Sequence, residues 1–371
     1  MQEQSQLSPE DITLYARQIS LPEIGVSGQQ KLKSARILCV GAGGLGSPAL
    51  LYLAGAGIGT IGIVDDDNIE PSNLHRQVLY TTADVGRKKI QVAKERLSAL
   101  NPAVNFILHE EHLQKNNALS IIANYDLVID GSDNFATRYL VNDACFHLKK
   151  PNIYASILQF AGQCSIFCAP QGPCYRCLYE SPPPPKLIPS CADSGVLGVL
   201  PGLLGTIQAT EAIKLILGIG KPLVGRLLTI DALTMQFREL HIRQNPNCLL
   251  CAHQQSFDTL PNYETNQCVL SNIAEDEITP QQLRTLQLQK TDFLLLDVRE
   301  PYEHHTFNLG GLLVPLAQLP SQLNKLDPKR LTVVYCRVGA RSAYAVKLLQ
   351  KHGFTNVKNL IGGVLAWQAE F

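Results

Sequence analysis

The sequence has no excess of charge of either sign. Its 371 residues contain 32 lysines and arginines and 32 aspartates and glutamates, so the formal net charge at pH 7 is zero. Proteins that bind nucleic acids or membrane surfaces usually carry a basic excess. We therefore expect no nucleic-acid partner and no membrane partner, and we expect a small molecule or another protein as the substrate.

Long apolar runs and targeting segments are also missing. The longest apolar stretch, residues 195–207, ends before Gln208, Glu211 and Lys214, and it is shorter than the roughly 20 residues that a membrane-spanning helix needs. The polar segment 1–11 lacks the basic start and apolar run of a secretory signal. These absences predict a cytoplasmic protein.

The sequence also lacks a P-loop motif and an internal repeat. No GxxxxGK[ST] motif occurs, which excludes a P-loop nucleotide site, and the sequence has no internal repeat. The 11 cysteines are an odd number. Two CxxC pairs and one cysteine at the end of a predicted strand indicate metal binding and catalysis in a reducing compartment, and not a disulfide framework.

The chain is long enough for two domains. Short apolar strands alternate with helical patterns, which predicts an α/β protein: a doubly wound, Rossmann-like first domain and a smaller α/β second domain. We predict domain limits of 1–252 and 273–371, with a polar linker at 253–272. The strands are expected at 35–41, 60–65, 125–131, 293–298 and 331–336, and the helices near 47–56, 88–100 and 342–352.

A glycine-rich loop lies between the first predicted strand and helix. Gly41, Gly43 and Gly46 fit the GxGxxG pattern, and Asp65 ends the next strand. In this arrangement the glycines let phosphates approach the backbone, and the carboxylate binds ribose hydroxyls. The loop alone would fit an NAD site equally well.

The residues that follow add cations and polar donors. Asn73, Arg76 and Lys89 could surround a triphosphate, which accumulates negative charge when a carboxylate attacks it. The same residues could belong to a solvated turn and a surface helix. Asp133 follows another strand and could hold Mg²⁺, but Asp130 could do the same, or either could cap the next helix.

Two CxxC pairs predict a metal site, and a separate cysteine loop predicts a site that holds sulfur. Four thiolates suit a closed tetrahedral Zn²⁺ site, although redox dithiols remain an alternative. Cys336 ends a predicted strand before a helix, where backbone N–H groups, Arg337, Gly339 and Arg341 could stabilise a persulfide. An inert buried cysteine is the alternative. The predicted metal ligands are Cys174, Cys177, Cys248 and Cys251.

Residues 10–252 resemble the ThiF/MoeB family, which is related to the ubiquitin-activating enzymes. The resemblance rests on the motifs at 36–67, 72–77, 133–134, 192–198 and 208–214. It implies ATP-dependent adenylation of the C-terminal glycine of a ubiquitin-like sulfur-carrier protein. It also implies a homodimer, because the arginine of the 15–19 motif, Arg17, reaches the neighbouring subunit's ATP. The cofactor-binding residues implied are Gly41, Gly43, Gly44, Gly46, Asp65, Ser72, Asn73, Leu74, His75, Arg76, Lys89, Asp133, Asn134 and Arg17.

Residues 273–371 resemble a rhodanese domain. The resemblance rests on the cysteine loop at 336–342, the 296–303 segment and the closing 362–367 segment. It implies that Cys336 carries sulfur as a persulfide and that a cysteine desulfurase supplies it. The segment 307–311 departs from the usual rhodanese pattern, and we interpret Asp297 and Arg299 as structural.

Together these features predict an adenylyltransferase and sulfurtransferase that uses ATP, Mg²⁺ and Zn²⁺. The expected catalytic residues are Cys336, Cys191, Asp133 and Arg76. Cys191 could accept the acyl group as a thioester, join the carrier through an acyl disulfide, or take no part. A dehydrogenase with a regulatory rhodanese domain and a non-catalytic carrier scaffold remain alternatives. The sequence leaves open whether the carrier serves molybdopterin, thiamine or tRNA thiolation.

Overall fold

The computed structural model of the chain describes residues 6–181, 195–252 and 276–371. These residues divide into two compact units, the first within 6–181 and 196–252 and the second within 276–371. Cys191 and the whole predicted linker, 253–272, lie outside the described residues.

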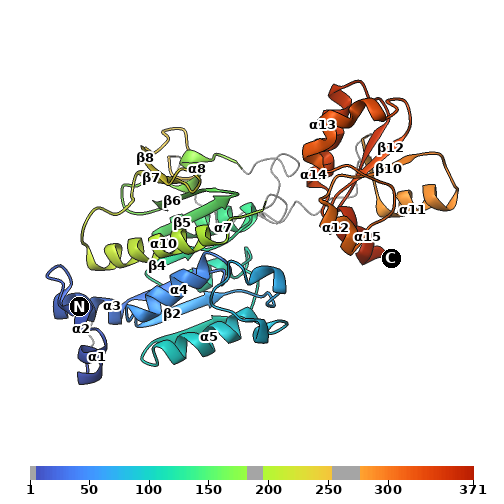
Figure 1. Ribbon diagram of the computed structural model, residues 1–371. Helices are drawn as coiled ribbons and strands as arrows, with labels where there is room; N and C mark the ends of the chain where they lie inside the picture. Colours follow the sequence, from blue (N-terminus) through green and yellow to red (C-terminus); the bar gives the residue numbers. More distant parts are fainter. Residues whose placement is uncertain (1–5, 182–194, 253–275) are drawn as a thin grey trace. The chain divides into compact units, whose positions relative to one another are not determined.

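The first unit is built on an eight-stranded sheet with the order β3-β2-β1-β4-β5-β6-β7-β8 (Figure 1). Strands β3 to β5 in this order are parallel, and β6, β7 and β8 continue the sheet antiparallel. The order of the strands reverses between β1 and β4, which is where open α/β sheets bind ligands. The strands are β1 (Arg36–Val40), β2 (Thr60–Val64), β3 (Asn105–His109), β4 (Leu127–Asp130), β5 (Asn152–Leu158), β6 (Ala161–Phe167), β7 (Arg226–Asp231) and β8 (Gln236–His241).

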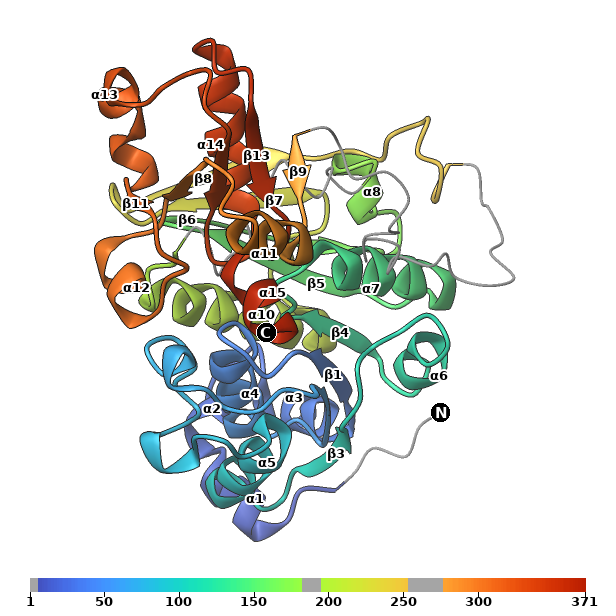
Figure 2. The ribbon, with the colours of Figure 1, turned by 90° about the vertical axis from the view of Figure 1, so that its right-hand side faces the viewer.

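Helices cover both faces of this sheet. Helices α3, α4, α5 and α10 pack on one face, and α6, α7 and α8 pack on the other (Figure 2). The helices of this unit are α1 (Pro9–Leu14), α2 (Ala16–Ile19), α3 (Gly25–Ser34), α4 (Gly46–Gly55), α5 (Lys89–Leu100), α6 (Ala118–Ile122), α7 (Phe135–Leu148), α8 (Tyr175–Leu178) and α10 (Val199–Leu217).

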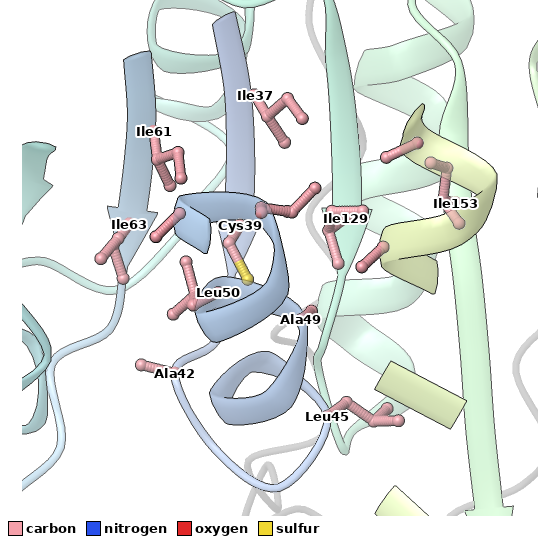
Figure 3. Packing of buried hydrophobic residues seen from close by; sticks show 14 of the residues in the cluster. Ile37, Cys39, Ala42, Leu45, Ala49, Leu50, Ile61, Ile63, Ile129 and Ile153 are labelled. Carbon is pink, nitrogen blue, oxygen red and sulfur yellow. The ribbon is translucent and has the colours of Figure 1, made fainter. Parts of the chain in front are cut away.

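Alternate residues of β1 supply the two cores, as a strand period of two requires. Ile37 and Cys39 face α4 and α10, whereas Leu38 and Val40 face α6 and α7. Figure 3 shows Leu50 of α4 among the buried side chains of the first of these faces. Truncating Leu50 to alanine would cost about 2–5 kcal/mol of stability because it would leave a cavity.

Helix α10 is long and apolar enough to cross a membrane by length and composition alone. It lies against the sheet, where Gln208 Nε2 donates to the carbonyl oxygens of Asp130 and Ile153, at 2.8 Å each. Core helices of globular proteins pass the same test, so this feature is weak evidence for a membrane span.

The second unit has a five-stranded parallel sheet with the order β11-β10-β12-β13-β9. Alternate residues again face opposite cores, since Leu296 and Val334 pack in one cluster and Leu295 and Val333 in another. Its elements are β9 (Glu277–Ile278), α11 (Pro280–Leu288), β10 (Leu294–Asp297), α12 (Pro301–Thr306), β11 (Leu312–Leu313), α13 (Leu319–Gln322), β12 (Thr332–Tyr335), α14 (Ala340–Lys351), β13 (Val357–Leu360) and α15 (Gly363–Glu370). The α/β fold predicted from the sequence is confirmed in both units.

Candidate functional site

The glycine loop connects β1 to α4, and two of its glycines are required by the turn. Gly41 has a φ of 91°, and its N–H donates to Val64 O at 2.8 Å. A Cβ at Gly46 would lie 2.0 Å from Gly41 O. No side chain fits there, so glycine is needed at position 46 for the chain to turn directly into the helix.

Gly43 has a different environment. A Cβ at Gly43 would meet only Gln77 Nε2, at 3.6 Å, which is ordinary van der Waals contact. Packing within the protein therefore does not require glycine at this position. A bare backbone that faces a pocket residue suits the close approach of a phosphate.

A polar pocket of about 410 Å³ lies beside this loop. Four of the residues predicted to bind the cofactor, Asn73, Arg76, Lys89 and Asp133, line it. The pocket is also lined by Asp66, Asp67, Asn68, Glu70, Gln77 and Lys88.

Asp65 connects β2 to the glycine loop. Its Oδ2 accepts from Ala42 N at 2.8 Å, and its Oδ1 accepts from Asp67 N at 3.0 Å. Burial raises the pKa of this carboxyl group, although Lys89 and the two N–H groups oppose that effect. Asp65 thus holds the loop in shape at the carboxyl end of β2.

The 3₁₀ turn at Pro71–Asn73 positions the next group of predicted residues. Ser72 O accepts from Arg76 Nη1 at 2.9 Å and contacts His75 Nδ1 at 3.1 Å. Leu74 packs against the first core. Asn73 and Arg76 therefore line the pocket, while Ser72, Leu74 and His75 support the segment that carries them.

Asp130 and Asp133 differ clearly in exposure. Asp130 is fully buried, and its Oδ1 accepts from Ser132 N at 3.0 Å and Ser132 Oγ at 2.6 Å. Burial raises the pKa of this carboxyl group. Asp133 is exposed and lines the pocket, so the geometry favours Asp133 as the carboxylate that would hold Mg²⁺. Asn134 caps α7 by accepting from Thr137 N at 2.9 Å.

Lys89 and Arg17 have unlike surroundings. Lys89 is the first residue of α5, is buried, and pairs with Asp67 at 2.6 Å. Arg17 lies on α2 and is exposed. It is not among the residues that line the pocket, so the role predicted for it needs a second copy of the chain.

The four cysteines predicted to bind metal lie together. Their sulfur atoms all fall within 4.8 Å of one another. The sulfur of Cys174 lies 3.8 Å from that of Cys177 and 3.6 Å from that of Cys248, and the sulfurs of Cys177 and Cys251 are 3.2 Å apart. Zn–S bonds of about 2.3 Å in a tetrahedron require sulfur separations of about 3.8 Å. The donor set and its spacing fit Zn²⁺.

The first cysteine pair is fixed to α7. Tyr175 N donates to Asn142 Oδ1 at 2.7 Å, and Arg176 binds Asp143 with its Nε at 2.9 Å and its Nη2 at 2.8 Å. A hydrogen bond from Cys174 lowers the pKa of Cys177 to about 5, whereas burial raises the pKa of Cys251 to about 12. Zn²⁺ binds deprotonated thiols, so metal binding at these cysteines would release protons.

In the second unit, Cys336 follows β12 directly and is fully buried. Its sulfur accepts from Gly339 N at 3.1 Å and from Ser342 Oγ at 3.4 Å. The start of α15 fixes the backbone of the loop, because Val364 N donates to Cys336 O at 2.9 Å and Leu365 N donates to Arg337 O at 3.0 Å. Gly363 must be glycine, since a Cβ would lie 2.3 Å from Cys336 O.

The sequence predicts that Arg337 and Arg341 help to stabilise a persulfide on Cys336. Arg341 makes two hydrogen bonds to Glu303 of α12, at 2.7 Å each, and Arg337 is exposed. Among the described residues, the Gly339 amide and the Ser342 hydroxyl lie within hydrogen-bond distance of the sulfur. Neither the Ser342 hydroxyl nor the Glu303 carboxylate was expected from the sequence to contact this loop.

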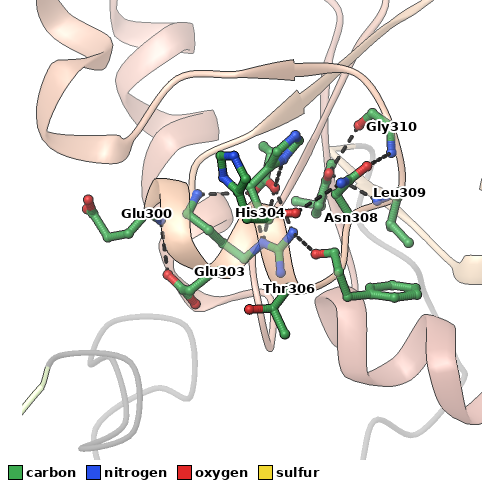
Figure 4. A network of polar contacts seen from close by, with 12 residues as sticks. Glu300, Glu303, His304, Thr306, Asn308, Leu309 and Gly310 are labelled. Carbon is green, nitrogen blue, oxygen red and sulfur yellow. Dashed lines mark hydrogen bonds and ion pairs between the residues drawn. The ribbon is translucent and has the colours of Figure 1, made fainter.

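The segment 307–311, which departs from the usual rhodanese pattern, is held by a polar network (Figure 4). Asp297 pairs with Arg299 at 2.7 Å, and Arg299 Nη2 donates to Phe307 O at 2.8 Å. Leu309 N donates to the Tyr335 hydroxyl at 3.2 Å. Asp297 and Arg299 therefore have structural contacts in this unit.

Comparison with known proteins agrees with this geometry. Residues 15–250 match the ThiF family and residues 279–370 match the rhodanese-like domain. A probable adenylyltransferase/sulfurtransferase MoeZ of Mycobacterium tuberculosis is 45% identical over 98% of this chain and 94% of its own length. A sulfur carrier protein adenylyltransferase of Thermus thermophilus is 52% identical over 69% of this chain and 96% of its own.

A solved structure agrees on the fold of the first unit. The crystal structure of E. coli MccB with MccA-N7isoASN matches with a TM-score of 0.57 at 24% identity, over 64% of this chain and 74% of that one. These relatives support the adenylation interpretation of the glycine loop over the dehydrogenase and scaffold alternatives. The chain therefore belongs to the ThiF family, carries a C-terminal rhodanese-like domain, and is an adenylyltransferase and sulfurtransferase enzyme.

Proposed function

We propose that this enzyme adenylates the C-terminal glycine of a ubiquitin-like sulfur-carrier protein and converts it to a thiocarboxylate with sulfur from Cys336. The observation that carries the proposal is the pocket beside the glycine loop, where Asn73, Arg76, Lys89 and Asp133 meet. The relative from Thermus thermophilus, whose name specifies a sulfur carrier protein, supports the choice of substrate.

The adenylation step uses the cations of this pocket. A carboxylate oxygen of the carrier attacks the α-phosphorus of ATP, and the bond between that phosphorus and pyrophosphate breaks. Arg76 and Lys89 stabilise the negative charge that develops on the phosphate oxygens. Mg²⁺ held by Asp133 would neutralise further charge on the triphosphate.

The sulfur-transfer step uses the second unit. The terminal sulfur of a Cys336 persulfide attacks the acyl carbonyl, and AMP leaves with its phosphate oxygen. A thiolate then attacks the Cys336 sulfur, which breaks the S–S bond, releases the thiocarboxylate and leaves a disulfide for a dithiol reductant to restore. Cys191 is our candidate for this thiolate, and a cysteine desulfurase is our candidate for the sulfur donor.

An apolar surface of the first unit suits the carrier. Strand β5 extends past the end of β4 to Leu158. Just beyond it, Ala232 N donates a hydrogen bond to Phe160 O at 2.9 Å. Large apolar side chains are exposed in this region, at Leu158, Phe160, Leu197, Val199 and Leu233. We propose that the carrier docks on them, because exposed apolar groups of this kind mark interaction sites.

A second apolar surface supports the proposed homodimer. A hollow of about 770 Å³ lies between α4 and α10, and its lining includes Leu51, Tyr52, Leu100 and Ile213. Tyr52 is 61% exposed. A partner subunit packed on this face would bury these side chains and could bring its Arg17 to the neighbouring pocket.

We propose that Zn²⁺ at the four cysteines has a structural role, because four sulfur ligands leave no open position for chemistry. We also propose a cytoplasmic location, where reduced thiols persist.

Carrier-dependent ATP–pyrophosphate exchange tests the proposed function. We expect exchange only with a carrier that ends in Gly-Gly, and none with a carrier that lacks the terminal glycine. Nicotinamide binding without exchange would contradict the proposal.

Mixing two variants tests the shared site. Arg17→Ala and Asp133→Ala should each be inactive as homodimers. Heterodimers contain one pocket with both native residues, so mixing after subunit exchange should restore part of the activity. No recovery in verified heterodimers would contradict a role for Arg17 across the interface.

A further inference from the structure

Lys89 has an unusual environment for a lysine. Only 7% of its side chain is exposed, although its ammonium group lies in a pocket that also contains water-accessible carboxylates. It is the first residue of α5, and a helix N-terminus disfavours a cation. A buried charge in this position needs a nearby anion. Asp67 supplies it, with its Oδ2 at 2.6 Å from Lys89 Nζ.

Asp67 is held in place by its own backbone. Its N–H donates to Asp65 Oδ1 at 3.0 Å, and its carbonyl oxygen accepts from Lys89 N at 3.1 Å. Asn68 forms an antiparallel bridge with Lys88. The carboxylate of Asp67 is therefore fixed at the pocket while 67% of its side chain remains exposed.

Both partners line the pocket that we assign to ATP. A triphosphate needs the ammonium group of Lys89, and the atom that contacts this group without nucleotide is an anionic carboxylate oxygen. A phosphate oxygen has the same charge and accepts the same kind of hydrogen bond. The two anions cannot both take the place closest to Lys89 without repelling each other.

We propose that Asp67 occupies the position that an ATP phosphate oxygen takes when ATP binds, and that it thereby sets the affinity for ATP. This inference rests on the proposed function, since it takes ATP as the ligand of the pocket. Asp67 keeps Lys89 oriented into the pocket before ATP binds. When a phosphate replaces it, part of the gain in binding is offset by the lost ion pair and by repulsion from the displaced carboxylate.

Removal of the Asp67 charge would not leave Lys89 without a counter-charge. Asp65 remains close enough for the two groups to interact electrostatically, and its carboxylate contacts Ala42 N and Asp67 N. Asparagine at position 67 has the same shape and preserves both backbone hydrogen bonds. Asp67→Asn therefore removes the competing anion with little change in geometry.

The test is the dependence of pyrophosphate exchange on ATP concentration. We expect Asp67→Asn to lower the KM for ATP by about two- to fivefold, the range that corresponds to one partly exposed ion pair. The KM for ATP, and not the rate at saturating ATP, is the quantity that tests the proposal. Direct binding should show a larger gain for ATP than for AMP, which lacks the β- and γ-phosphates.

Glu95→Gln is the matched control. It makes the same carboxylate-to-amide change on α5 and breaks the surface pair of Glu95 with Arg87, at 2.6 Å, outside the pocket. It should leave the KM for ATP unchanged.

An unchanged or increased KM for ATP in a folded Asp67→Asn enzyme would overturn the inference. An equal gain in affinity for AMP and ATP would also overturn it, because AMP cannot compete through terminal phosphates. If the native enzyme shows no exchange, the proposed function fails instead, and the binding measurements still test Asp67.

Discussion

Glu303 of α12 accepts two hydrogen bonds of 2.7 Å each from Arg341, which belongs to the cysteine loop at 336–342. Burial raises the pKa of the Glu303 carboxyl group, but the hydrogen bonds lower it, and the pKa lies below its usual value. The pair is therefore charged at neutral pH. The guanidinium charge beside the sulfur loop is therefore neutralised from a different helix.

Glu303→Gln should make the surroundings of Cys336 more positive. We expect alkylation of Cys336 by anionic iodoacetate to accelerate by about two- to fivefold relative to neutral iodoacetamide, because the Arg341 charge is no longer compensated. Mass spectrometry of the Cys336 peptide measures both rates. A general loosening of the loop would change the alkylation rates with both reagents by the same factor, and that result would contradict this account. Asp292→Asn, which breaks the surface pair with Arg330, is the control.

Asp133→Asn should lower carrier-dependent pyrophosphate exchange by at least about 100-fold, because the triphosphate charge would lack its bound cation. Thermal unfolding should barely change, since Asp133 is exposed. Asp130→Asn should retain most of the exchange activity. Near-normal exchange by Asp133→Asn would transfer the metal role to Asp130 or to another group.

Cys336→Ala should separate the two reactions. The acyl-adenylate should form and accumulate, because Cys336 lies outside the unit that contains the polar pocket proposed to bind ATP. No thiocarboxylate should appear without the sulfur nucleophile.

Ser342→Ala removes only the hydroxyl that contacts the sulfur at 3.4 Å and should slow transfer by about two- to tenfold. Mass spectrometry of the carrier checks both variants, and full thiocarboxylate from Cys336→Ala would exclude Cys336 as the sulfur carrier.

Cys248→Ser should remove the metal and destabilise the first unit. We expect about one Zn²⁺ per native chain and much less in the variant by elemental analysis. Calorimetry should show a lower Tm for the first unit and an unchanged transition for the second. A fully active and equally stable native protein without zinc would return the four cysteines to the redox alternative.

The second unit should lose stability in acid through Asp297. Burial works to raise the pKa of this carboxyl group, but Arg299 and His304 hold it below its usual value. A lowered pKa contributes stability that is present above the unfolded value of about 3.9 and is lost as the pH falls through the folded value. Chemical unfolding followed from pH 5 to pH 2 should show a smaller pH dependence for Asp297→Asn. An identical slope would assign the acid sensitivity elsewhere.

Strands β1, β2 and β4 of the first sheet could be predicted because they are short apolar runs beside helical patterns, whereas no strand was expected at the positions of β3 and β5. The expected helix at 47–56 corresponds to α4 at Gly46–Gly55. Strand β8 could not be predicted in this way, since every residue of Gln236–His241 is exposed and its pairing with β7 alone defines it.

The candidate site also has residues that the sequence predicts and contacts that depend on the fold. Sequence spacing identified both Asp130 and Asp133, but only the register of β4 in the sheet decides which one is buried. The link from Glu303 to Arg341 joins α12 to α14, and no local pattern connects two helices that the chain separates by β11, α13 and β12.

The four-cysteine cluster also has a topological consequence. About 70 residues separate Cys177 from Cys248, and α10, β7 and β8 all belong to this stretch. A metal that joins its two ends turns the stretch into a closed ring, which restricts the unfolded chain more than the folded one. A cross-link around a ring of this size contributes about 4 kcal/mol by reducing the entropy of the unfolded chain. Cysteines that pack in the core beside α6 and α7 would thereby stabilise α10, which packs on the opposite face of the sheet.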